Sequence, residues 1–178
     1  MRHIISLLME NQPGALSRVV GLFSQRGYNI ESLNVSPTDD PTLSRLNVTT
    51  NSSEMQLEQI QKQLHKLIDV LKVQEVSELE HIERELLMVK VRASGFARAE
   101  VKRTADIFRG QIVDVTASQY TVQMAGTSEK LDAFIQALSE VTEVLEVARS
   151  GVVGIARGER ALKAYAIVIG KIVLKPLF

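Results

Sequence analysis

Hydrophobic positions along the first half of the chain follow two spacings in turn. Continuous or alternating apolar residues, typical of β-strands, alternate with apolar residues three and four positions apart, typical of amphipathic helices. The predicted elements are strands at 4–9, 33–35, 46–48 and 70–73 and helices at 16–23 and 53–68. The expected buried helix positions are Leu16, Val19, Val20 and Phe23, then Leu57, Ile60, Leu64, Leu67 and Ile68. The predicted order is strand, helix, strand, strand, helix, strand.

Local signals mark the turns between these elements. The turn-rich stretch 37–41 joins two strands and predicts a hairpin. Ser53, three residues before Gln56, resembles a capping box that opens the second helix. Gly27 follows the first helix, where a glycine suits the C-terminal cap.

The second half of the chain repeats this order. Gly110 follows a helical pattern as Gly27 does, 83 positions later (110 − 27 = 83), and VLEV at 144–147 echoes VLKV at 70–73. The strands are expected at 87–91, 113–115, 122–124 and 144–148, and the helices carry Val101 and Phe108, then Leu131, Phe134, Ile135 and Leu138. Two βαββαβ units predict an α+β protein with two ferredoxin-like sandwiches in tandem, each an antiparallel sheet with both helices on one face.

This repeat sets the expected domain limits. The first domain spans 1–78 and the second 79–160, with the charged stretch from Ser77 to Glu85 as the linker. The remaining segment, 161–178, is an apolar tail with β-prone residues at 165–169 and 172–174, to which we assign no function.

The face of each sheet opposite its helices, and the sheet edges, need polar side chains or a partner. His3, Ile4 and Ile5 make the first strand apolar in both directions. We therefore expect a homodimer with side-by-side or stacked sheets.

Composition narrows the function further. Lys plus Arg and Asp plus Glu each number 21, so no net charge attracts nucleic acid or acidic lipid. The absence of cysteine excludes disulfides, a thiolate nucleophile and cysteine-ligated zinc. The chain has no apolar span of about 20 residues and no signal peptide core, so we expect a cytoplasmic protein without a membrane segment.

The sequence contains no recognisable catalytic or metal motif. There is no G-x-S-x-G elbow, and His3, His65 and His81 lie in unrelated contexts, with His65 interpreted as a solvated surface residue. The carboxylates near His81 are interpreted as solvated linker residues, namely Glu78, Glu80, Glu83 and Glu85. The glycine-bearing stretch 150–158 matches neither phosphate-loop motif. Aromatic residues are only 4% of the chain, and no RNA-recognition motif is present, which disfavours RNA binding.

One turn remains as a candidate binding site, residues 10–16 between the first strand and the first helix. Pro13 suits the first helical turn, and Gly14 has no Cβ, so another molecule can approach the backbone closely. Free N–H groups at a helix start favour a carboxylate. The alternative interpretation is that Asn11 is a helix cap and Gly14 a turn residue.

Five stretches of the chain carry a family resemblance. In the first half these stretches are ENQPGALSRVVGLFSQRGYNIESLNV and TDDPTLSRLNV. In the second half they are EVKRTADIFRGQIVDVT, AGTSEKLDAF and VARSGVVGIARG. The first pair resembles the ACT domain of the regulatory small subunit of acetolactate synthase, and the other three resemble the carboxy-terminal domain of that family. The resemblance runs from Met1 to about Gly158.

The resemblance implies a non-catalytic role. Small subunits of this family raise the activity of a large subunit that uses thiamine diphosphate, magnesium and FAD, and they confer feedback inhibition by branched-chain amino acids. We therefore expect no cofactor or metal in this chain and expect the large subunit as its partner. Its two-domain length is similar to the valine-sensitive bacterial type, so we expect valine as the effector, with leucine and isoleucine left open.

The resemblance also implies the site residues. In the family, the effector binds between the ACT domains of two protomers. The matching positions are Asn11, Gly14, Ala15 and Leu16 from one chain and Asn29 and Ile30 from the other. Backbone N–H groups at Gly14, Ala15 and Leu16 would bind the valine carboxylate, and oxygens near Asn11 and Asn29 its ammonium group.

Two features depart from the family pattern. Family members commonly carry threonine and alanine at the positions of Asn34 and Ser36, and the tail matches nothing familiar. The alternative functions are a stand-alone amino-acid-binding ACT regulator and an RNA-binding ferredoxin-like module.

Overall fold

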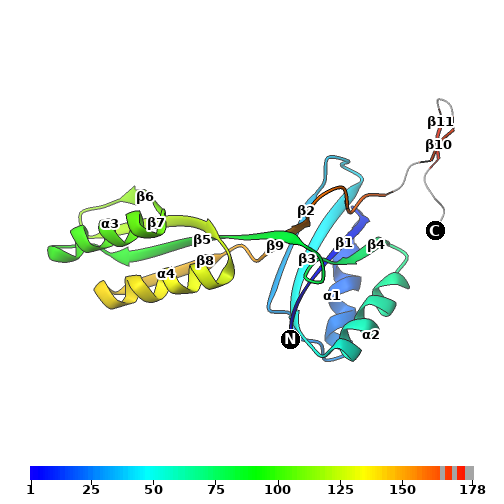
Figure 1. Cartoon of the computed structure of the whole chain (residues 1–178), viewed down its shortest axis with the longest axis horizontal. Coiled ribbons are helices and arrows are strands. Elements are labelled where there is room, and N and C mark those ends of the chain that lie inside the picture. The colour runs from blue at the N-terminus through cyan, green and yellow to red at the C-terminus, as the bar shows by residue number, and fades with distance from the viewer. Residues whose placement is uncertain (165–166, 170–171, 175–178) are drawn as a thin grey trace. The chain divides into compact units, whose positions relative to one another are not determined.

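The computed structural model describes the backbone of residues 1–164, 167–169 and 172–174 and the side chains of residues 1–164. It confirms the α+β class and the repeated βαββαβ order (Figure 1). The elements are β1 (Arg2–Glu10), α1 (Ala15–Gln25), β2 (Ser32–Pro37), β3 (Leu43–Asn51), α2 (Glu54–His65), β4 (Val70–Glu75), β5 (His81–Arg92), α3 (Phe96–Phe108), β6 (Gln111–Val115), β7 (Gln119–Gly126), α4 (Ser128–Val141), β8 (Val144–Arg149), β9 (Val153–Ala156), β10 (Ile167–Ile169) and β11 (Ile172–Leu174).

The chain divides into two compact units. The first contains residues 1–82 and 154–178, and the second contains residues 83–153. Residues 154–160 therefore belong with the first unit here, whereas the repeat grouped them with the second. The predicted linker is also partly a strand, because β5 begins at His81.

The first unit is an antiparallel sheet in the order β2-β3-β1-β4, with α1 and α2 on one face (Figure 1). Alternate residues of β1 point toward these helices, and they form a core with the buried faces of α1 and α2. The core residues are Ile5, Leu7, Met9, Ala15, Val19, Phe23, Leu46, Val48, Leu57, Ile60 and Leu64. The prediction that Ile68 is buried is wrong, because α2 ends at His65 and the Ile68 side chain is 89% exposed.

The two helices of this unit begin differently. At Ser53 the predicted capping box is confirmed, since its side chain accepts a hydrogen bond from the Gln56 backbone while the Gln56 side chain accepts one from the Ser53 backbone. Helix α1 begins at Ala15, so Pro13 precedes the helix instead of lying in its first turn. Gly14 occupies the N-cap position, where it provides no side-chain cap.

The second unit has the sheet order β6-β7-β5-β8, with α3 and α4 packed against it. Its core residues are Leu87, Val89, Val91, Val101, Ala105, Val122, Met124, Leu131, Phe134 and Leu138. Glu85 was interpreted as a solvated linker residue, and this is wrong. Its side chain is buried on β5, where it accepts hydrogen bonds from Arg149 of β8 at 2.8 and 3.1 Å.

After β8 the chain returns to the first unit. A Cβ on Gly154 would lie 3.1 Å from the Val76 side chain and 3.6 Å from that of Ile4. The Gly154 carbonyl accepts a hydrogen bond from Arg45 of β3 at 2.7 Å. These contacts explain why residues after 153 group with the first unit.

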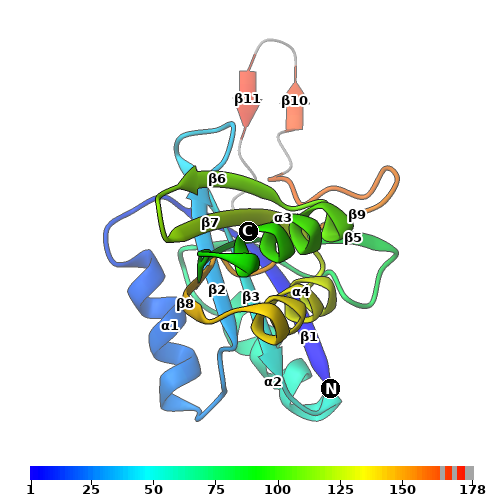
Figure 2. The same ribbon diagram turned by 90° about the vertical axis from the view of Figure 1, so that its left-hand side faces the viewer.

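Two short strands lie in the tail. Ile167–Ile169 and Ile172–Leu174 pair with each other in antiparallel register (Figure 2). Of the β-prone segment predicted at 165–169, Tyr165 and Ala166 lie outside the described residues. No helix in the described part of the chain is long and apolar enough to cross a membrane.

Candidate functional site

The turn from β1 into α1 is held against the loop that joins β2 to β3. The Asn11 backbone N–H donates to the Thr42 carbonyl at 2.8 Å, and its side-chain Nδ2 donates to the Pro41 carbonyl at 3.0 Å. Asn11 therefore anchors the turn and does not cap α1. Among the described residues no group donates to its side-chain oxygen, which can therefore accept a hydrogen bond from a ligand.

Gly14 adopts the left-handed conformation, with φ 84° and ψ −9°. The Ala15 N–H donates to the Gln12 carbonyl at 3.2 Å. Among the described residues, the backbone N–H groups of Gly14, Leu16 and Ser17 have no acceptor. Of the three predicted donors, Gly14 and Leu16 are therefore open, and the positive end of the α1 dipole lies at the same place.

A charged pair that the sequence interpretation missed borders this turn. Arg18 Nε donates to Asp69 Oδ2 at 2.5 Å, and Asp69 is buried while its backbone carbonyl accepts from the Glu10 N–H. This hydrogen bond raises the pKa of Arg18 above its ordinary value, so the guanidinium stays charged. The only sequence signal for Arg18 is its position four residues after Gly14, which places it one helical turn from the candidate binding turn.

Asn29 and Ile30 lie at the opposite end of α1 within the same chain. The Asn29 carbonyl accepts from Thr50 Oγ1 at 2.6 Å, and Thr50 pairs with His3 near the start of β1. Asn11 follows the end of β1 and lies eight residues after His3 (11 − 3 = 8). A strand of that length spans about 26 Å, so Asn11 and Asn29 lie near opposite ends of β1. The structure thus brings together Asn11, Gly14, Ala15 and Leu16 and keeps Asn29 and Ile30 apart from them.

The position of β2 at the edge of its sheet offers a way to bring Asn29 and Ile30 of one copy to the Gly14 turn of another. β2 is an edge strand of its sheet, it begins just after Ile30, and its last residue, Pro37, pairs with Ser44 near the Glu10 end of β1. If two copies paired antiparallel along β2, the start of one strand would lie beside the end of the other. Ile30 of one copy would then approach the Gly14 turn of its partner.

Asn34, one of the departures from the family pattern, lies on this edge strand. Its Oδ1 accepts a hydrogen bond from Asn47 Nδ2 at 2.9 Å, and Asn47 Oδ1 accepts one from Ser6 Oγ at 2.7 Å. Because Leu33 and Val35 pack against the helix-side core, Asn34 lies on the opposite face of the sheet.

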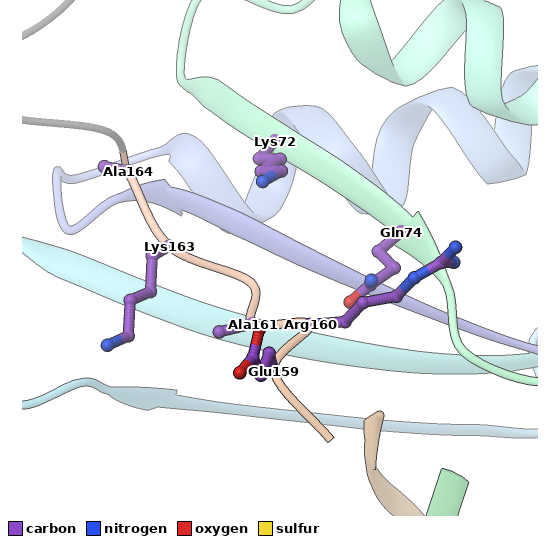
Figure 3. Close-up of a pocket in the computed structure, with 7 residues that line it drawn as sticks. All are labelled: Lys72, Gln74, Glu159, Arg160, Ala161, Lys163 and Ala164. Carbon is purple, nitrogen blue, oxygen red and sulfur yellow. The ribbon is translucent and has the colours of Figure 1, made fainter. Parts of the chain in front are cut away.

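The first unit also has hollows in its surface, one of which reaches Arg18. One, of about 720 Å³, is lined by Lys72, Gln74, Glu159, Arg160, Ala161, Lys163 and Ala164 (Figure 3). Figure 3 shows the Arg160 and Lys163 side chains pointing in different directions, so the cationic groups do not converge on one point. The other, of about 440 Å³, runs along α1 and α2 and is bordered by Arg18. In the described part of the chain, no three His, Asp or Glu residues lie close enough to hold a metal ion.

Comparison with known proteins covers both units. The family described as "AHAS small subunit-like ACT domain" matches residues 5–72, and the family described as "Small subunit of acetolactate synthase" matches residues 84–158. The chain is 63% identical over 163 residues to the acetolactate synthase isozyme 3 small subunits of Salmonella typhimurium and Escherichia coli, covering 92% of this chain and 100% of each relative.

A solved structure is also similar. The acetolactate synthase small subunit from Thermotoga maritima matches with a TM-score of 0.82 and 36% identity, covering 90% of this chain and 99% of that chain.

Proposed function

Because the chain belongs to the family of acetolactate synthase small subunits, we propose that it binds the catalytic large subunit, raises its activity and makes it subject to feedback inhibition by valine. The chain is the regulatory partner, and the reaction takes place in the large subunit, where we expect thiamine diphosphate, magnesium and FAD. We expect the complex to work in the cytoplasm.

The observation that carries the proposal is the open start of α1. The N–H groups of Gly14 and Leu16 have no acceptor in the described structure and would bind the valine carboxylate. The free side-chain oxygen of Asn11 would accept from the valine ammonium group, joined by Asn29 of a second copy. Ile30 of that copy would cover the isopropyl group.

A site of this kind couples binding to regulation. Valine holds two chains in one arrangement, and that arrangement determines the surface offered to the large subunit. By linkage, the inhibited form of the complex must bind valine more tightly than the active form, by about 1–3 kcal/mol in typical cases. Leucine differs from valine by one methylene, which is worth about 1–3 kcal/mol in an apolar pocket, so valine selectivity is modest.

Reconstitution with the large subunit tests this proposal. We expect the purified chain to bind the large subunit, to raise its turnover of pyruvate and to make that turnover sensitive to valine, with leucine and isoleucine weaker. A chain that binds valine but neither associates with the large subunit nor changes its turnover would instead be a stand-alone amino-acid regulator.

The positions of the aromatic residues disfavour the RNA-binding alternative. In the described part of the chain, five aromatic side chains pack in or against the two cores, and Phe96 lies on α3. The five are Phe23, Tyr28, Phe108, Tyr120 and Phe134. None of these residues lies on a helix-free sheet face, where stacking on RNA bases would require it.

A further inference from the structure

We propose that Arg18 binds the effector's carboxylate directly and that Asp69 is the positioning residue that holds its guanidinium in place. The inference rests on the proposed effector site and adds to it two residues outside the six that the family resemblance supplies. It makes the ligand class an α-amino acid with a free carboxylate, and it excludes as strong effectors those analogues in which a neutral group replaces the carboxylate.

The Arg18 guanidinium lies over Gly14. A Cβ on Gly14 would be 3.0 Å from Arg18 Nη1, 3.6 Å from Cζ and 3.7 Å from Nη2. The guanidinium therefore borders the space that the glycine leaves open. A carboxylate that binds the open N–H groups of Gly14 and Leu16 would lie beside these two nitrogens.

Within the described part of the chain, only the Nε group of the Arg18 guanidinium makes a hydrogen bond. Nε donates to Asp69, while Nη1 and Nη2 have no acceptor among the described residues. The Arg18 side chain is 49% exposed and borders the hollow along α1, so a small molecule can reach it. A fixed guanidinium with two unused donor groups matches the geometry of a carboxylate.

Asp69 explains why the guanidinium is fixed. Its side chain is 8% exposed, and its backbone carbonyl accepts from the Glu10 N–H at 2.8 Å. The same residue thus anchors the end of β1 and the orientation of Arg18. Because Asp69 holds the Nε side of the guanidinium, the Nη1 and Nη2 side can bind a ligand. Less side-chain entropy is lost on binding than for an arginine that moves freely.

The test compares valine with valinamide, which keeps the ammonium and isopropyl groups but replaces the carboxylate by a neutral amide. Binding to the full-length chain is measured by calorimetry for the natural protein and for Arg18→Gln. We expect Arg18→Gln to weaken valine binding about 10- to 100-fold, because a charge-assisted hydrogen bond is lost. Valinamide binding should change less than about threefold, so the preference for valine over valinamide shrinks.

Three further variants complete the experiment. Arg18→Lys should recover part of the preference, since the charge remains but the fork is lost. Asp69→Asn should reduce the preference less than Arg18→Gln does, in protein whose circular dichroism is unchanged. Arg103→Gln removes an equivalent charge from α3 in the second unit and should leave both affinities as they are.

The outcomes separate the two proposals. If the natural chain binds valine and Arg18→Gln binds it equally well, or loses valine and valinamide binding in the same proportion, the role of Arg18 is refuted while the effector site stands. If the natural chain shows no valine binding alone or with the large subunit, both proposals are refuted.

Discussion

At Gly14, one missing Cβ has two consequences. The left-handed backbone turns the chain from β1 into α1, and the absence of a side chain leaves open the space beside the Arg18 guanidinium. Any side chain at position 14 strains the left-handed backbone and also enters the space beside Arg18. Two variants with side chains of different size share the cost in stability and differ in their effect on valine binding.

We predict that Gly14→Asp abolishes valine inhibition of the reconstituted complex and leaves activation largely intact. The new carboxylate would occupy the position of the effector's own carboxylate, against Arg18. Gly14→Ala adds only a Cβ and should weaken inhibition partially. Both variants should lose about 1–2 kcal/mol of stability through the left-handed backbone. The measurement is turnover against valine concentration, and unchanged valine binding by Gly14→Asp in calorimetry would contradict the site.

A second prediction concerns Glu78, which follows β4. The carboxylate of Glu75 raises the pKa of Glu78, with burial and Glu54 acting in the same direction and His3 opposing them. A raised folded-state pKa means that Glu78 contributes stability below the ordinary value of 4.5, and that this contribution is lost as pH rises through the folded-state pKa. At neutral pH the repulsion between the Glu78 and Glu75 carboxylates remains and lowers stability.

Glu78→Gln should therefore raise the thermal midpoint at pH 7.5 and have little effect at pH 4. The gain should be below about 1 kcal/mol, because Glu78 is exposed and solvent screens the repulsion. Glu58→Gln is the control of opposite sign, because Lys62 lowers the pKa of Glu58. A stability gain from Glu78→Gln that persists at pH 4 would refute the electrostatic explanation.

At the scale of elements, local signals predicted the helices best where a side chain caps them. The capping box at Ser53 begins α2 within one residue of its predicted start. Ile68 fits the helical spacing, but α2 stops before it, so periodicity alone overextended the helix. Pro13 was expected inside α1, yet the helix starts only after the left-handed Gly14, a conformation that residue spacing does not report.

The candidate site was predictable only in part, for a physical reason. The backbone donors at Gly14 and Leu16 follow from the position of a helix start, which the sequence locates. Arg18 and Asp69 are 51 positions apart (69 − 18 = 51), and only the packing of α1 against the loop before β4 brings them together. Whether Asn29 and Ile30 join the site depends on a second copy and stays a prediction.

The contacts of Arg149, which join β8 to β5 and to α4, allow a third prediction. Arg149 Nη2 and Nε donate to Glu85, Nη1 donates to Asp132 of α4, and these contacts raise the pKa of Arg149. Arg149→Met leaves the buried Glu85 carboxylate without its main donor and should cost about 1–3 kcal/mol in urea denaturation. Asp132→Asn should cost less than about 1 kcal/mol, because the Asp132 side chain is 65% exposed. If the two variants lost equal amounts of stability, the burial of Glu85 would not be what makes Arg149 important for stability.

At the scale of the whole molecule, the proposed site exists only in a dimer. Each chain would carry one half at the start of α1 and the other half beyond its end, and α1 alone, with 11 residues, is about 16 Å long. No movement of a side chain spans that distance within one chain. The proposed site therefore links valine binding to the association of two copies.

The linkage sets the last prediction in quantitative form. A ligand that binds only the dimer, present at 100 times its dissociation constant, stabilises the dimer by about 2.7 kcal/mol per site. This corresponds to an association of the two chains that is about 100-fold tighter for each occupied site. Sedimentation velocity over a dilution series, with and without valine, should show this shift. Asn29→Ala should reduce it, because the half-site on the second copy is weakened. A dimer dissociation constant that stays the same while valine binds saturably would mean that one chain holds the whole site, which the separation of Asn29 from Gly14 argues against.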